Sequence, residues 1–213
     1  MIRIDAKAGE KLICADSDRL SYGGRIDFSA PESPVFVFSG SFVSMSFTGS
    51  TLSAVVKNNH GWLDNYLGYI LDGQQKKILL ANDDVCHEIK LAADLESDKR
   101  HQVTLFKRQD GCHEFWFCGF AISGDGDVLP PSNGYRRRME FYGDSAAAGE
   151  LVEAADHRGV DIRGHRGEFS NVYYSYAWVT ARNLKARVNI IAQSGIALLD
   201  KAGYFGAPDP IGM

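Results

Sequence analysis

The sequence has few of the features that mark a specialised class of protein. Only 4 of its 213 residues are cysteine and 6 are proline, and the net charge at pH 7 is −4. No two cysteines have the CxxC spacing of a structural zinc site. The run Gly124-Asp125-Gly126-Asp127 lacks the spacing and the final glutamate of an EF-hand, so we interpret it as a turn. We expect neither a metal ion nor a cofactor.

Long apolar runs and a wide basic face are also missing. No run approaches the ~18 residues of a membrane span, and the first residues lack the apolar core of a signal peptide. We therefore expect a cytoplasmic protein, or a secreted or periplasmic one whose leader was removed. The triplet Arg136-Arg137-Arg138 is interpreted as a solvated lead-in to a strand. Neither nucleic acid nor a membrane is expected as a partner.

The four cysteines are Cys14, Cys86, Cys112 and Cys118. Cys112 and Cys118 are an even number of residues apart, which would place them on one face of a strand. We interpret all four as free thiols buried in the core of a sheet.

Short apolar runs broken by turn residues fill the chain from Arg19 to Ile122. Phe42 to Phe47 alternates apolar and small polar residues, and Ser39-Gly40, Thr48-Gly49 and Asp72-Gly73 supply turns. This pattern is typical of a β-sandwich or jelly roll. We predict an antiparallel jelly roll over residues 1–130, with no long helix between 19 and 128, followed by a linker at 124–134.

The pattern changes after the linker. We predict strands over 139–142 and 188–192, and helices over 146–155 and 171–185, the second with Ser170 as its N-cap. This order is the β-α-α-β opening of a parallel α/β layer. A remnant of only two strands is expected to expose an unpaired edge and apolar helix faces.

The segment from Met139 to Ser145 is the most informative part of the chain. Gly143 permits a sharp turn after a strand, and three alanines then allow a helix to start directly behind Ser145. Such a strand–turn–helix exposes a serine hydroxyl near backbone N–H groups, which is the geometry of a nucleophile. Gly195 follows the second predicted strand, so its N–H is expected to lie close enough to Ser145 to share an oxyanion with it.

Several motifs together resemble a known family. Gly143-Asp144-Ser145, followed by Ser194-Gly195-Ile196-Ala197-Leu198, resembles the first two conserved blocks of the SGNH (GDSL-like) hydrolases. Other segments, in the same order, resemble the family 2 carbohydrate esterases, in which a jelly roll precedes an SGNH domain. These segments are Tyr22 to Phe28, Phe38 to Ser41, Phe47 to Ser50, His101 to Val103, Lys107-Arg108, Gly119-Phe120 and Asn171 to Ala181.

The resemblance implies a fold and a reaction. The fold would be a jelly roll over 1–130 and, over 131–213, the first β-α-α-β part of a three-layer α/β/α SGNH domain. The reaction would be serine-type removal of acetyl groups from a xylan-like polysaccharide or oligosaccharide. Ser145 would be the nucleophile, and the N–H groups of Ser145 and Gly195 would form an oxyanion hole. Gly143 and Asp144 would support the turn.

Two elements of the family's site are not found after Gly195. They are the asparagine of a GxND-like block and the histidine that acts as general base. His157 and His165 follow the nucleophile in sequence and are the substitutes to consider, whereas His60, His87, His101 and His113 belong to the β part. We expect the 213 residues to be a fragment, and to be nearly or wholly inactive alone.

The alternative is a non-catalytic carbohydrate-binding or interaction module that carries a degenerate hydrolase remnant. Exposed aromatic residues such as Trp62, Tyr66 and Tyr69 would then stack on sugar rings, although aromatic residues in a sandwich more often belong to its core. An acetylated carbohydrate is the partner that the first hypothesis implies. Turnover of an acetate ester separates the two hypotheses.

Overall fold

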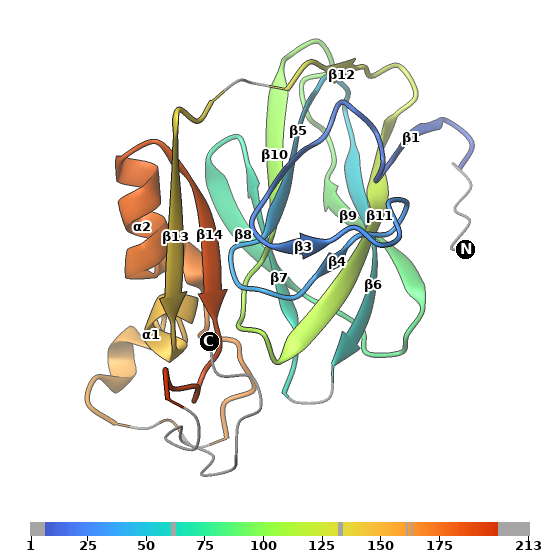
Figure 1. Ribbon diagram of the computed structural model, residues 1–213. Helices are drawn as coiled ribbons and strands as arrows, with labels where there is room; N and C mark the ends of the chain where they lie inside the picture. The colour runs from blue at the N-terminus through green and yellow to red at the C-terminus, as the bar shows by residue number, and fades with distance from the viewer. Residues whose placement is uncertain (1–6, 61–62, 132–133, 161, 163, 200–213) are drawn as a thin grey trace.

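Most of the regular structure is β-sheet. The computed structural model describes residues 7–60, 63–131, 134–160, 162 and 164–199 (Figure 1). The first strands are β1 Glu10–Cys14, β2 Ser21–Gly23, β3 Ile26–Asp27, β4 Val35–Phe36, β5 Phe42–Phe47, β6 Leu52–His60, β7 Tyr66–Leu71, β8 Gln74–Leu79, β9 Cys86–Ala92, β10 His101–Lys107, β11 His113–Ser123 and β12 Val128–Leu129. As predicted, the described residues between 19 and 128 contain no helix.

These strands form two antiparallel six-stranded sheets. One has the order β3-β4-β11-β6-β9, with β1 also paired to β11, and the other has the order β12-β5-β10-β7-β8, with β2 paired to β5. The alternating side chains of both sheets meet in one apolar core, which includes Phe36, Phe47, Phe115 and Phe117. We call this part, residues 10–129, the β-sandwich. Because β12 pairs with β5, residues 128–129 belong to a sheet as well as to the predicted linker.

The rest of the described chain forms a small parallel layer. Strands β13 (Arg137–Gly143) and β14 (Ala186–Ala192) pair in parallel. Between them lie α1 (Ser145–Ala148), the 3-10 turns η1 (Ala155–His157) and η2 (Val172–Tyr174), and α2 (Tyr176–Asn183). The predicted β-α-α-β order is therefore present.

The lengths of both helices were predicted wrongly. The first ends after one turn, because Gly149 adopts a left-handed conformation (φ 75°) and its N–H caps the carbonyl of Ser145. The second is divided at Ser175, whose extended backbone separates η2 from α2. Asn171 caps η2 and Ser175 caps α2, so Ser170 is not the N-cap.

The parallel layer packs against the outer face of the β5–β10–β7 sheet (Figure 1). Phe42 and Phe106 are opposite each other in neighbouring strands, and both pack in one cluster with Trp178 of α2. The Phe106 and Trp178 ring centroids lie 5.0 Å apart at 82°. The expected exposure of apolar helix faces was therefore wrong for α2, whose apolar side covers the sandwich. The outer edge of β13 has no partner strand among the described residues.

The cysteines correct a further prediction. All four are free, but only Cys118 is buried; Cys14 is exposed, and Cys86 and Cys112 are half-buried. Cys112 precedes β11, and a bulge shifts the register between Phe117 and Gly119, so the even spacing did not place two thiols on one face. Across the described residues, no helix has the length and apolar character needed to cross a membrane.

Candidate active site

The two parallel strands end side by side and bring the two predicted motifs together. Gly143 pairs with Ala192, so the turns that contain Ser145 and Gly195 leave the same edge of the layer. Both residues line one cavity of about 770 Å³. Side chains of the β-sandwich line it too, including Asp110, Cys112 and His113. The cavity therefore lies between the parallel layer and the β-sandwich.

Ser145 is the first residue of α1, directly after the turn that leaves β13. Asp144 caps the helix, and its Oδ1 accepts a hydrogen bond from the N–H of Ala146 at 3.0 Å. A Cβ at Gly143 would lie only 2.6 Å from Cβ of Ala147, so the close start of α1 requires glycine there. The Ser145 side chain is partly exposed, and its hydroxyl makes no hydrogen bond within the described residues.

In the turn after β14, all but one of the backbone N–H groups from Gln193 to Ile196 donate a hydrogen bond. The N–H of Gln193 donates to the carbonyl of Gly143, and that of Ile196 donates to the carbonyl of Gln193. The N–H of Ser194 donates to Oδ2 of Asp110 at 3.0 Å. Gly195 has a φ of 79°, and its N–H has no partner among the described residues. A backbone donor therefore stays available at the cavity that Ser145 lines.

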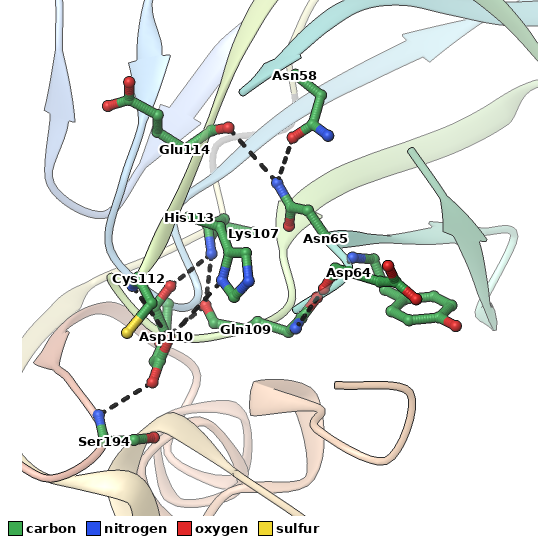
Figure 2. A network of polar contacts seen from close by, with 12 residues as sticks. Asn58, Asp64, Asn65, Lys107, Gln109, Asp110, Cys112, His113, Glu114 and Ser194 are labelled. Carbon is green, nitrogen blue, oxygen red and sulfur yellow. Dashed lines mark hydrogen bonds and ion pairs between the residues drawn. The ribbon is translucent and has the colours of Figure 1, made fainter. Parts of the chain in front are cut away.

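Asp110 lies in the connection between β10 and β11 and accepts hydrogen bonds from several residues (Figure 2). Its Oδ1 accepts from the N–H of Cys112 at 3.1 Å, and its main-chain carbonyl accepts from Nζ of Lys107 at 2.6 Å. Burial alone would raise the pKa of the Asp110 carboxyl, but the hydrogen bonds from Ser194 and the Lys107 ammonium together hold that pKa below its ordinary value.

Lys107 is fully buried beneath this connection. Its Nζ also donates to the carbonyl of Gln109 at 3.0 Å, so the ammonium is satisfied by main-chain oxygens. Burial lowers the pKa of Lys107 to about 8, with the Asp110 charge acting in the opposite direction. The charged side chain thus fixes the shape of the loop that carries Asp110.

The candidate histidines differ in where they lie relative to Ser145. His165 lines the cavity, and its Nδ1 is buried with no hydrogen-bond partner. His157 lines a different cavity of about 350 Å³ and packs against Phe169. His113, of the β part, also lines the cavity of Ser145, with Nδ1 3.9 Å from Oδ1 of Asp110.

The other two histidines with described side chains have structural partners. Nδ1 of His101 lies 2.7 Å from Oδ2 of Asp72, and Nε2 of His87 lies 2.8 Å from Oδ2 of Asp83. Neither lines the cavity, so among the described side chains His113 and His165 are the histidines that do.

Residues 164–169 are held against the β-sandwich at the side of the cavity. Arg166 makes a bidentate ion pair with Asp64, with N–O distances of 2.9 and 2.7 Å. Gln109 donates to the carbonyl of Asp64 at 2.9 Å (Figure 2). Deeper in the protein, the fully buried Arg108 pairs with Glu153, which also accepts from Nδ2 of Asn171 at 2.7 Å.

The proposed sugar-stacking aromatics do not gather at this cavity. Tyr69 is a core residue, 5% exposed, whose hydroxyl donates to the carbonyl of Leu91. Tyr66 is half-buried below the ammonium of Lys77. Trp62 lies outside the described residues. Sequence reasoning missed Asp110 and set His113 aside with the other histidines of the β part, because no local motif relates either residue to Ser145.

Comparisons of the sequence and of the structure with known proteins point to the same family. Residues 22–131 match the family model described as "Carbohydrate esterase 2 N-terminal". The chain is 33% identical over 196 residues to the cellulase/esterase CelE of Acetivibrio thermocellus, across 92% of this chain and 23% of that protein.

Solved structures agree. A family two carbohydrate esterase from Clostridium thermocellum, in complex with cellohexaose, matches with a TM-score of 0.79 and 33% identity over 91% of this chain and 56% of its own. An acetyl xylan esterase from Butyrivibrio proteoclasticus matches in fold with a TM-score of 0.75 at 20% identity, over 88% of this chain and 50% of its own. The chain thus spans about half the length of these solved relatives.

Proposed function

We propose, from the premise that this chain belongs to the carbohydrate esterase 2 N-terminal family, that it carries the nucleophile half of a serine-type carbohydrate O-acetylesterase. In this proposal residues 1–130 are a jelly-roll accessory domain, and 131–213 are the N-terminal part of an SGNH hydrolase domain. The substrate is an acetylated xylan-like polysaccharide or oligosaccharide. The observation that carries the proposal is the shared cavity, to which Ser145 brings a hydroxyl and Gly195 an available N–H.

The proposed reaction begins with attack of the Ser145 oxygen on the acetyl carbonyl carbon. The negative charge that develops on the carbonyl oxygen is stabilised by the N–H groups of Ser145 and Gly195. Each such donor is typically worth ~3–4 kcal/mol in the transition state. The proton of the Ser145 hydroxyl passes to a general base as the new bond forms. The bond between the carbonyl carbon and the sugar oxygen then breaks, and the sugar oxygen takes that proton and leaves as a hydroxyl. Water, deprotonated by the same base, attacks the acetyl-serine, which releases acetate and restores the Ser145 hydroxyl. Gly143 and Asp144 act by holding the turn rather than by touching the substrate.

The reaction also needs a group that accepts the proton of the Ser145 hydroxyl. A general base must reach the serine hydroxyl at ~2.6–3.2 Å, and no described residue makes that hydrogen bond. The family resemblance implies a histidine from a later part of the domain. We therefore expect the 213 residues alone to be nearly or wholly inactive, and a chain that extends over the length of the solved relatives to turn over efficiently.

The test is hydrolysis of methylumbelliferyl acetate by both chains, each with Ser145→Ala. Ser29→Ala is the matched control, because Ser29 is an exposed serine of the β3–β4 loop whose hydroxyl only contacts Asp27. We expect Ser145→Ala to abolish turnover by the longer chain and Ser29→Ala to leave it unchanged.

Two outcomes would contradict the proposal. Equal turnover by Ser145→Ala and by the unchanged chain would remove Ser145 from the reaction. No turnover by the longer chain, together with binding of the polysaccharide, would favour the alternative of a non-catalytic carbohydrate-binding module. A strong loss with His165→Ala or His157→Ala in the 213-residue chain would instead identify a local base.

A further inference from the structure

The turn that carries Gly195 is hydrogen-bonded to a residue from another part of the protein. Asp110 precedes Ser194 by 84 residues and lies in the β-sandwich, yet its carboxylate is the acceptor for the Ser194 N–H. The neighbouring donors at Gln193 and Ile196 are satisfied within the parallel layer. The N–H of Ser194 is instead held by a side chain of the β-sandwich (Figure 2).

Asp110 is well suited to hold a fixed geometry. Each of its two carboxylate oxygens accepts one backbone N–H, Oδ1 from Cys112 and Oδ2 from Ser194. Its main chain is fixed by the buried ammonium of Lys107. The exposed fraction of the Asp110 side chain is 11%, so little water competes for these bonds.

Loss of this acceptor would change which way the turn presents its donors. Adjacent peptide units are coupled through the φ and ψ angles between them, so a free Ser194 N–H allows the peptide that carries the Gly195 N–H to rotate. An oxyanion donor works only when it lies about 2.7–3.1 Å from the position of the developing charge. A small rotation of the turn would therefore remove its contribution.

We propose that Asp110 is a positioning residue of the ester-hydrolysing site, which holds the Ser194 N–H so that the Gly195 N–H faces the cavity. The β-sandwich would then complete the oxyanion hole, in addition to any contact it makes with carbohydrate. This inference rests on the proposed function, and its experiment includes a readout that does not require turnover.

The first measurement is amide hydrogen exchange in the 213-residue chain, followed at Ser194 by mass spectrometry or NMR. The Ser194 amide of the unchanged protein is expected to exchange at least tenfold more slowly than an unprotected amide. Asp110→Ala is expected to accelerate it at least tenfold. Asp110→Asn, which keeps one acceptor oxygen for two N–H donors, is expected to fall between them.

The matched control is Asp127→Asn, which removes an equal charge from an exposed ion pair with Lys11. This variant is expected to leave the exchange of Ser194 unchanged. An unprotected Ser194 amide in the unchanged protein would overturn the inference without any variant, even where Asp110→Ala does not fold. Unaltered exchange in a folded Asp110→Ala protein would overturn it as well.

The second measurement separates kcat from KM for methylumbelliferyl acetate. In the longer chain, Asp110→Ala is expected to lower kcat by about 10²-fold and to change KM less than twofold, since the oxyanion forms only in the transition state. Unchanged kcat would overturn the positioning role. A chain whose turnover does not depend on Ser145 would instead refute the proposed function, while the exchange of Ser194 still reports on the contact with Asp110.

Discussion

Trp178 provides the clearest test of how the parallel layer is held to the β-sandwich. The side chain is 6% exposed and packs against the rings of Phe42 and Phe106, with ring centroids at 6.3 and 5.0 Å. Gly23 and Gly68 make room for these two phenylalanines, because a Cβ at either glycine would lie about 2 Å from a ring atom. We expect Trp178→Ala to destabilise the whole protein, and α2 most directly.

The magnitude follows from the size of the group that is removed. A buried tryptophan truncated to alanine costs ~3–5 kcal/mol, since the cavity closes only in part. For a chain of this length each kcal/mol lowers Tm by roughly 2–4 °C. The expected decrease in Tm is therefore about 6–20 °C.

Thermal unfolding followed by circular dichroism measures this effect. Trp116→Ala is the matched control, because Trp116 is half-buried and its main special contact is the ammonium of Lys57 at 4.1 Å. A cation–π contact at such a site is worth ~0.5–1 kcal/mol, so a smaller decrease is expected. If Trp178→Ala lowers Tm no more than Trp116→Ala does, the layer is not held by this cluster.

Three further changes test other parts of the account. Gly143→Ala should cost ~1–3 kcal/mol by overpacking against Ala147, measured by urea unfolding, and an unchanged stability would mean that the turn has room. Arg108→Met should lower the free energy of unfolding by ~3–5 kcal/mol, because Glu153 loses its buried partner. Adding Glu153→Leu should recover much of that loss. No recovery would show that the ion pair is not the cause of the loss. Lys107 has a folded pKa of about 8, below its ordinary value of 10.5, so the unfolded chain binds more protons between these values and stability should rise with pH there. From pH 8 to 10 the unchanged protein should gain about 2 kcal/mol relative to Lys107→Met in denaturant unfolding, and a constant difference would refute a buried, titrating lysine.

Strands were predictable because their signals are local. The alternation from Phe42 to Phe47 reports directly which side chains face a core, and the strand before Gly143 ends where the glycine permits a turn. The helix boundaries were less predictable. Gly149 ends α1 early, and Ser175 ends η2 and caps the start of α2. Both effects depend on backbone conformations that the sequence allows but does not require.

The contacts between distant segments could not be read from the sequence. Phe42 and Phe106 look like ordinary core positions of strands, yet they face outward and bury the parallel layer. Asp110 looks like a turn residue after a strand, and its partner Ser194 is 84 residues later. The Ser145 motif was visible from sequence, whereas the residues that surround it from the β-sandwich became visible only in the folded chain.

The most direct test of the account is a crystal structure of the longer chain after reaction with an acetate-like phosphonate. Such a reagent bonds to an activated serine and leaves a tetrahedral oxygen where the oxyanion forms. We predict a bond to Oγ of Ser145, with that oxygen about 2.7–3.1 Å from the N–H groups of Ser145 and Gly195. A bond to another residue, or an oxygen directed away from Gly195, would contradict an ester-hydrolysing site at this cavity.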